Sequence, residues 1–126
     1  ETPIVMTGLE TAELTKYAAN AFLATKITFI NEMADLCEKL GADVQDVARG
    51  MGLDGRIGRK FLHAGPGYGG SCFPKDTLAL TRTAQEVGAP VRLVETVVQI
   101  NDRRKGAMAG RIMQACGGHV RGKTIG

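Results

Sequence analysis

The sequence predicts an all-α fold of two long helices, joined by shorter helices and a glycine-rich loop. Residues 9–40 contain neither Pro nor Gly and are rich in residues that favour helices. In residues 9–40 and 91–116, apolar residues recur at spacings of three, four and seven, which is typical of one helix face. Glycine and proline gather between these segments, where they end helices.

The first long helix is expected over residues 9–40, where Gly41 provides a C-terminal stop. At 1.5 Å per residue it would span about 45 Å. Asp43 is suited to cap a short second helix, which glycines and the Asp54-Gly55 turn then end. The apolar face of the first helix carries Phe22, Phe29, Met33, Leu36 and Leu40, and that of the second Val44, Val47, Ala48 and Met51.

Residues 64–74, AGPGYGGSCFP, contain four Gly and two Pro and predict an irregular loop that exposes its backbone. A third helix is expected from residues 74–76 to Gly88, because Pro and Asp both suit a first turn. Residues 91–116 predict the second long helix, and residues 119–126 a turn and the beginning of a strand. Long helices on so small a domain leave apolar surface uncovered, so we expect self-association.

Composition fits one globular domain of 126 residues with a net charge of +3. The densest basic cluster, Arg103–Lys105, has no aromatic neighbours, so we interpret it as a solvated helix face rather than a nucleic-acid site. No apolar run approaches the roughly 18 residues of a membrane span. The first residues also lack the pattern of a signal peptide.

Three cysteines, Cys37, Cys72 and Cys116, lie far apart without a C-x-x-C spacing, which argues against zinc and redox-pair sites. An odd number of cysteines without a secretory signal indicates free thiols in a reducing compartment, and we expect the cytoplasm. Because the chain begins at Glu1 and stops at Gly126 within an expected strand, we expect neither end to be a natural terminus.

Cys72 has the surroundings of an activated nucleophile. It lies in the glycine-rich loop just before a predicted helix, whose N-terminal N–H groups favour a thiolate. Lys75 adds a positive charge, while Gly69 and Gly70 let the backbone approach a ligand closely. A lone Cys is otherwise most often a small core residue, and we interpret Cys37 and Cys116 as residues that fill the core or the surface without a chemical role.

Four other residues are candidates for the same chemistry. Lys16 and Asn20 are four residues apart on the first helix and share a face, where a partly buried Lys could donate a proton or stabilise an oxyanion. Asp76 could orient a water, and Arg56 could bind an anion. The alternatives are a solvated pair for Lys16 and Asn20, a helix-dipole role for Asp76 and a solvated Arg56.

The sequence lacks a dinucleotide-binding G-x-G-x-x-G after a strand and a P-loop. A nucleotide cofactor would therefore bind to sequence outside these residues. His63 and His119 are isolated, without metal-ligand spacing.

The string GPGYGGSCFPKD, residues 65–76, closely resembles the cysteine motif of the UDP-glucose and GDP-mannose dehydrogenases. AELTKYAANAFLATKITFINE (12–32) and LDGRIGRKFL (53–62) resemble two further segments of that family. The resemblance implies a 6-phosphogluconate-dehydrogenase-C-terminal-like central domain at residues 9–118, which carries the nucleophile and a homodimer interface. Residues 1–8 would then be a remnant of the NAD-binding domain, and residues 119–126 the start of a nucleotide-sugar-binding domain.

The resemblance also implies chemistry: oxidation of a sugar C6 hydroxyl to a carboxylate with two NAD⁺, through a thiohemiacetal and a thioester on Cys72. Lys16 would move protons and stabilise the charged oxygen, and Asn20 and Asp76 would hold water or the oxyanion. Arg56 would reach the substrate of the partner subunit, and UDP-glucose is favoured over GDP-mannose or UDP-N-acetylmannosamine. The loop backbone at Gly69 would contact the sugar, with Tyr68 and Phe61 nearby. Lys75 would contribute a positive charge to the site.

Two interpretations from other classes remain open. The chain could serve only as a dimerisation module, with its long helices as the functional surface. It could also be a cysteine hydrolase, which would need a histidine base, and His63 is the candidate nearest to Cys72 in sequence.

Overall fold

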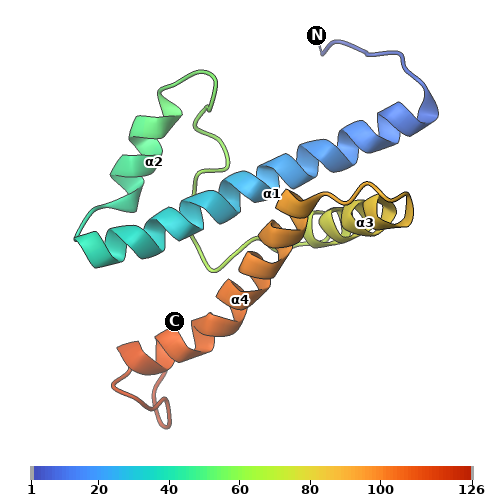
Figure 1. Cartoon of the computed structure of the whole chain (residues 1–126). Coiled ribbons are helices and arrows are strands. Elements are labelled where there is room, and N and C mark those ends of the chain that lie inside the picture. Colours follow the sequence, from blue (N-terminus) through green and yellow to red (C-terminus); the bar gives the residue numbers. More distant parts are fainter. Residues whose placement is uncertain (1, 126) are drawn as a thin grey trace.

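The computed structural model describes residues 2–125, which form helices and loops and, within that range, no strand. The helices are α1 (Leu9–Leu40), α2 (Val44–Gly52), α3 (Phe73–Glu86) and α4 (Arg92–Ala115). The all-α prediction, with long outer helices and shorter ones between them, is confirmed (Figure 1). Residues 1 and 126, the far ends of the two expected flanking segments, lie outside the described range.

The helix ends follow the predicted chemistry. Gly41 adopts φ 70°, a left-handed conformation that glycine tolerates, and its N–H donates to the Cys37 carbonyl, which ends α1. The Asp43 carboxylate accepts a hydrogen bond of 2.7 Å from the Gln45 N–H and caps α2. The strand expected after residue 119 is wrong for residues 119–125, which form turns and coil. A strand needs a neighbouring strand for its hydrogen bonds, and residues 2–125 provide none.

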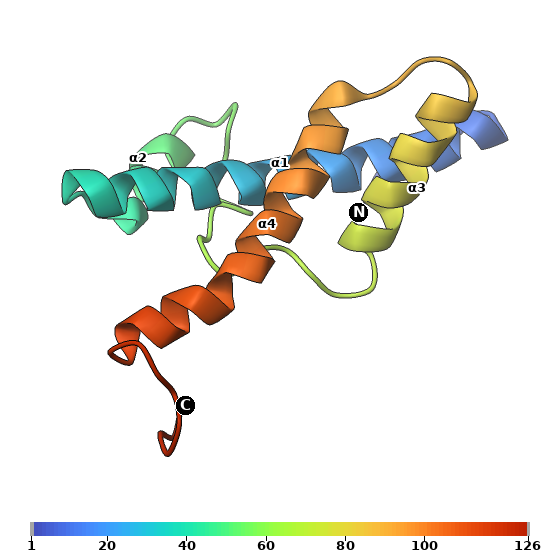
Figure 2. The ribbon, with the colours of Figure 1, turned by 60° about the horizontal axis from the view of Figure 1, so that its bottom comes forward.

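Helix α1 is the axis of the molecule and contacts each of the other three helices. In Figures 1 and 2, α3 lies against its N-terminal half, α4 crosses its middle, and α2 folds back beside its C-terminal end. The last turns of α4 and the C-terminal tail extend beyond the rest of the molecule. No helix within residues 2–125 is both long and apolar enough to cross a bilayer.

The core is small and lies along one side of α1, where short side chains let the neighbouring helices approach. We call Ala21, Ala24, Thr28, Asn31 and Ala34, all buried, the inner lane. Ala21 packs with Leu80 of α3 and Val94 of α4. Ala24 packs with Tyr68 of the glycine-rich loop and Val97 of α4.

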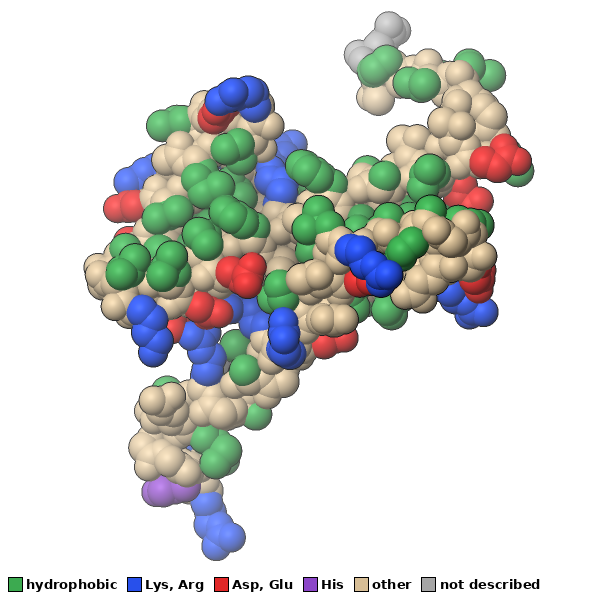
Figure 3. Space-filling model, viewed as in Figure 1, with side chains coloured by type: hydrophobic (Ala, Val, Ile, Leu, Met, Phe, Trp, Pro, Cys, Tyr) green, Lys and Arg blue, Asp and Glu red, His purple; other side chains and the backbone are tan. Residues whose placement is uncertain are grey.

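Another side of α1 carries large apolar residues that the described chain covers only in part. Phe22, Phe29, Leu36 and Leu40, the outer lane, are 66%, 43%, 49% and 71% exposed. Hydrophobic side chains gather over α2 and the C-terminal part of α1 in the space-filling view (Figure 3). The accessible surface is 9092 Å², whereas a compact monomer of this mass exposes roughly 6,500 Å². The expectation of uncovered apolar surface is therefore confirmed.

Candidate active site

Cys72 lies at the junction between the glycine-rich loop and α3. It is the N-cap residue of α3, and its carbonyl accepts a 2.8 Å hydrogen bond from the Asp76 N–H. The side chain is exposed, with the Ser71 Oγ at 3.8 Å from its Sγ. The thiol is therefore open to a ligand and lies beside the unpaired N–H groups of the first helical turn.

Lys16 and Asn20 of α1 meet Asp76 of α3 where the two helices cross, and Asp76 lies four residues after Cys72. The Lys16 Nζ donates to the Asp76 Oδ2 at 3.0 Å, and the Asn20 Nδ2 donates to the same oxygen at 2.6 Å. Asp76 follows Cys72 by one helical turn, so the Lys16–Asn20–Asp76 group is held beside the cysteine. The structure thus brings together all four residues predicted to be catalytic.

The electrostatics of this group follow from its hydrogen bonds. The bond to Asp76 raises the pKa of Lys16, and burial opposes this; weaker attractions, including one from Cys72, add to the rise. The bonds from Lys16 and Asn20 lower the pKa of Asp76 against the effect of burial, and the Lys75 charge adds to that shift. Asp76 is 4% exposed, so its charge depends on these donors. Both members of the ion pair stay charged at neutral pH.

One detail of the prediction is corrected: Lys16 was expected to be partly buried, yet its side chain is 63% exposed. Only the far end of the side chain is tied down, by the buried carboxylate. An exposed ammonium held at its tip can reach a ligand at Cys72 without unpacking the helix.

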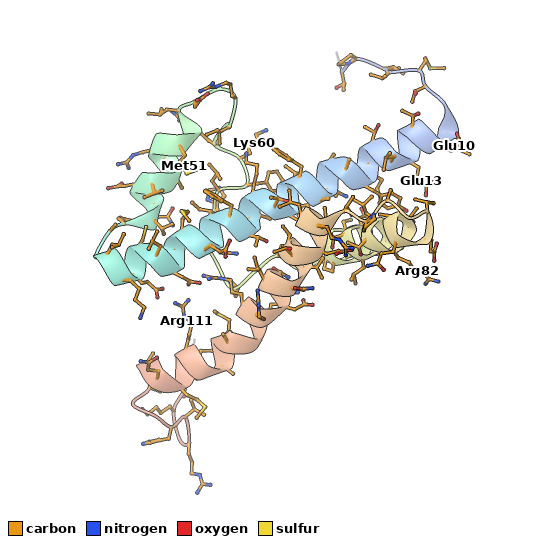
Figure 4. The ribbon with its side chains drawn as sticks, viewed as in Figure 1. Glu10, Glu13, Met51, Lys60, Arg82 and Arg111 are labelled. Carbon is orange, nitrogen blue, oxygen red and sulfur yellow. The ribbon has the colours of Figure 1, made fainter. Side chains whose placement is uncertain are left out.

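An aromatic cluster begins at the residue after Cys72. The ring of Phe73, the next residue, lies edge-on to Phe61 at 6.0 Å and to Tyr68 at 6.1 Å. Phe61 has φ 65°, an uncommon conformation for a bulky residue, which indicates local strain. A cleft of about 440 Å³ opens beside Phe61 and is lined by Ile27, Lys60, Phe61, His63, Gly67 and Tyr68. Figure 4 locates Lys60 next to α1.

Among the other residues predicted to bind substrate, Gly69 and Lys75 are exposed on the loop and the first turn of α3. Tyr68 is only 4% exposed, and burial raises its pKa. Its ring therefore anchors the loop in the core. The exposed part of the loop that remains for the predicted contact with a sugar is its backbone.

Arg56 is not brought together with Cys72. It lies in the turn after α2, where its guanidinium donates to the Asp54 carboxylate at 2.6 Å and remains largely exposed. Figures 1 and 2 show this turn at the α2 end of the molecule, away from the start of α3. The turn borders an apolar groove of about 300 Å³ that includes Phe22, Phe29 and Met51.

Sequence reasoning missed three polar residues that hold the loop: Asn31, Asn101 and Arg104. Asn31 and Asn101 are 2% and 3% exposed and occupy helix lanes that are otherwise apolar or small, which was the available signal. The solvated helix face predicted for Arg103–Lys105 is wrong for Arg104, whose side chain is 10% exposed. Further along α4, Arg111 pairs with Asp35 and Glu38 and faces the end of α1 (Figure 4).

Neither a metal nor a dinucleotide fits the residues described. No group of three or more His, Cys, Asp or Glu side chains within residues 2–125 is placed to hold a metal ion. A dinucleotide pyrophosphate is cradled by a strand, a glycine turn and a helix. The glycine-rich loop here follows a loop and not a strand.

Comparison with known proteins agrees with this geometry. Residues 10–103 match the UDP-glucose/GDP-mannose dehydrogenase family, central domain. The chain belongs to this family. It is 70% identical over 125 residues to the UDP-glucose 6-dehydrogenase of Rhizobium meliloti (strain 1021), covering 99% of this chain and 29% of that protein.

Two further relatives extend the family match. The UDP-glucose 6-dehydrogenase TuaD of Bacillus subtilis (strain 168) is 54% identical, over 98% of this chain and 26% of its own length. A UDP-glucose dehydrogenase structure from Pyrobaculum islandicum superposes with a TM-score of 0.87 at 40% identity, over 93% of this chain and 27% of that one. The chain therefore spans under a third of the length of the relatives it matches.

Proposed function

We propose that this chain is the central domain of a UDP-glucose 6-dehydrogenase, which oxidises UDP-glucose to UDP-glucuronate with two NAD⁺. The observation that carries the proposal is the exposed Cys72 beside the Lys16–Asn20–Asp76 group. A thiol, a cation and a hydrogen-bonded carboxylate at one helix crossing are the parts needed to oxidise an aldehyde through a thioester. GDP-mannose and UDP-N-acetylmannosamine are the alternative substrates.

In the proposed reaction, the Cys72 sulfur adds to the C6 aldehyde, and the carbonyl oxygen becomes the hydroxyl of a thiohemiacetal. Lys16 stabilises negative charge on that oxygen, since Asp76, one helical turn after Cys72, holds its ammonium. Loss of a hydride from C6 and of the proton from the hydroxyl leaves a thioester, and water then cleaves its C–S bond to give the carboxylate and the free thiol. Asn20 and Asp76 are placed to orient that water.

The hydride acceptor is NAD⁺, which we place in a part of the protein outside residues 9–118, because these residues do not form a dinucleotide site. Residues 1–8 and 119–126 would join the central domain to the NAD-binding and nucleotide-sugar-binding domains. The isolated chain is then expected to be inactive. The three unpaired cysteines fit a reducing compartment, the cytoplasm.

The remaining site residues would serve substrate binding. We assign the sugar contact to the backbone at Gly69, with Phe61 and Tyr68 beside it. Lys75 would contribute a positive charge to the site. Arg56 lies next to the outer lane, in the turn after α2, which Figure 1 shows away from the start of α3. Because Arg56 does not approach Cys72 of its own chain, we assign it to the substrate bound by the other copy. The uncovered outer lane thus supports a homodimer.

The experiment is to supply the full-length protein with UDP-glucose and NAD⁺ and count the NADH formed per sugar consumed. Two NADH per sugar are expected. Turnover with GDP-mannose alone would correct the substrate and keep the chemistry. A protein that oxidises none of the three nucleotide-sugars would overturn the proposal.

A second candidate function is a dimerisation module without chemistry of its own, which the exposed outer lane favours. NADH formation distinguishes it, since light scattering should find a dimer under either proposal but only the enzyme forms NADH. A strict monomer would exclude the module.

A further inference from the structure

The glycine-rich loop before Cys72 is held by side chains from both long helices. At Gly65, the N–H donates to the Asn31 Oδ1 at 2.7 Å, and the carbonyl accepts from the Arg104 Nε at 2.6 Å. At Tyr68, the N–H donates to the Asn101 Oδ1 at 2.8 Å, and the carbonyl accepts from the Asn101 Nδ2 at 3.2 Å. Both backbone groups of two loop residues are thus satisfied by helix side chains, as a strand partner would satisfy them.

The clamping side chains are themselves fixed. Asn31 and Asn101 are buried in the helix interface. Arg104 also donates to the Asn31 carbonyl at 3.1 Å and to both Asp35 carboxylate oxygens at 2.9 and 2.8 Å. A guanidinium with three partners and a buried amide have little rotamer freedom, so they define the loop position rather than follow it.

Gly67 fits this arrangement for two reasons. Its φ is 124°, a conformation that L side chains rarely adopt, and a Cβ there would lie 2.7 Å from the Asn101 Oδ1. The loop therefore passes Asn101 at a distance that only glycine permits. One turn further along α4, the Lys105 Nζ lies 5.8 Å from the centre of the Tyr68 ring, within cation–π range.

We propose that Asn31, Asn101 and Arg104 form a loop clamp, a set of positioning residues that hold the glycine-rich loop so that Cys72 faces the Lys16–Asn20–Asp76 group. None of the three touches the reacting atoms. The catalytic consequence rests on the proposed function, whereas the mechanical claim stands on the hydrogen bonds. Aldehyde oxidation uses Cys72 and alcohol oxidation does not, so the clamp matters most for the second oxidation.

Amide hydrogen exchange in the full-length protein tests the mechanical claim without reference to activity. Asn101→Ala is expected to speed exchange of the Tyr68 N–H at least tenfold, with less effect at Gly65. Asn31→Ala should speed exchange of the Gly65 N–H more than that of the Tyr68 N–H. The matched control is Val94→Ala, a buried α4 residue that packs on Ala21 and Leu80 away from the loop. Unchanged Tyr68 exchange in Asn101→Ala would overturn the clamp.

If Asn101→Ala does not fold, Gly67→Ala reaches the same contact from the loop, since its Cβ must displace the Asn101 side chain. Faster exchange at Tyr68 is expected there too. Wild-type exchange at Tyr68 in a folded Gly67→Ala protein would count against the clamp.

The catalytic consequence is read from the rate of oxidation of the C6 aldehyde of UDP-glucose, divided by the rate for UDP-glucose itself. Asn101→Ala is expected to lower this ratio about tenfold, whereas a protein that is merely less stable loses both rates equally. An unchanged ratio would show that the loop position does not matter for Cys72. If wild type oxidises neither compound, the proposed function fails, while the exchange experiment still decides the clamp.

Discussion

The two sides of α1 differ in what they carry and in what covers them. The inner lane consists of small or polar residues and is buried under α3, α4 and the glycine-rich loop. The outer lane consists of Phe and Leu, and each of its side chains keeps at least two fifths of its surface exposed. The lane of Phe and Leu therefore remains partly open in the described chain, whereas the lane of small and polar residues makes the contact with α3, α4 and the loop.

The difference has a physical reason. Helices that must cross closely and leave room for a loop use Ala, Thr and Asn, because bulky side chains would hold them apart. Burying a Phe or Leu is worth about 1.5–3 kcal/mol, so an exposed lane of four such residues favours association with a second surface. On this account, chemistry belongs to the inner side of α1 and assembly to the outer side.

The largest expected effect is on the inner side, at Cys72. In the full-length protein, Cys72→Ser should reduce carboxylate formation from UDP-glucose by about 10³-fold or more, because a serine hydroxyl is a far weaker nucleophile than a thiolate. Product is measured by chromatography. The control is Cys116→Ser, a partly buried cysteine at the end of α4, which should keep normal activity. Normal oxidation by Cys72→Ser would place the chemistry elsewhere.

Lys16→Ala should reduce turnover by about 10²- to 10³-fold, the usual loss when one group that stabilises an oxyanion is removed. The initial rate of NADH formation measures it. Lys39→Ala removes a cation from the last turn of the same helix and should change little. Equal losses in the two variants would mean that charge on α1, and not contact at the site, is responsible.

On the outer side, Phe22→Asp combined with Phe29→Asp should convert the proposed dimer to a monomer, since two charges would have to be buried. Light scattering measures the mass. Leu78→Asp places a charge on an exposed apolar residue of α3 and should leave the mass unchanged. A dimer that survives the double change would contradict assembly through this lane.

The smallest effect is on the pH dependence of stability. Because the pKa of Asp76 is lowered in the folded protein, its ion pair stabilises fully above the ordinary carboxyl range, about pH 4, and is lost as the pH falls below it. The melting temperature of Asp76→Asn should therefore lie below that of wild type at pH 7, and the gap should narrow toward about pH 3. A gap that stays constant would argue against this pairing.

Most of the fold could be predicted from the sequence because helix boundaries are encoded locally. Gly41 ends α1 through its left-handed backbone, and Asp43 begins α2 through its side chain. Pro74 lies in the first turn of α3, where its ring suits a helix start. The side of α1 that would be buried could not be predicted in this way. Apolar spacing indicates a face, but not whether the same chain or another surface covers it.

For the site, Cys72 was identified from its loop and its helix start, and Lys16 from its spacing to Asn20. The contact of Lys16 and Asn20 with Asp76 depends on how α1 crosses α3, because Asp76 lies 60 residues after Lys16 in the sequence. The loop clamp was beyond sequence reasoning for a similar reason. An Asn or Arg on a helix is usually solvated, and only the crossing of α4 over α1 brings Asn101 and Arg104 to the loop.

The most direct test of the central claim is to trap the covalent intermediate. The Asp76→Asn enzyme should be acid-quenched during turnover with UDP-glucose and NAD⁺, digested and analysed by mass spectrometry. The account predicts a glucuronyl thioester on the peptide that contains Cys72, released by hydroxylamine. An adduct on another residue, or product formation with no adduct at all, would contradict it.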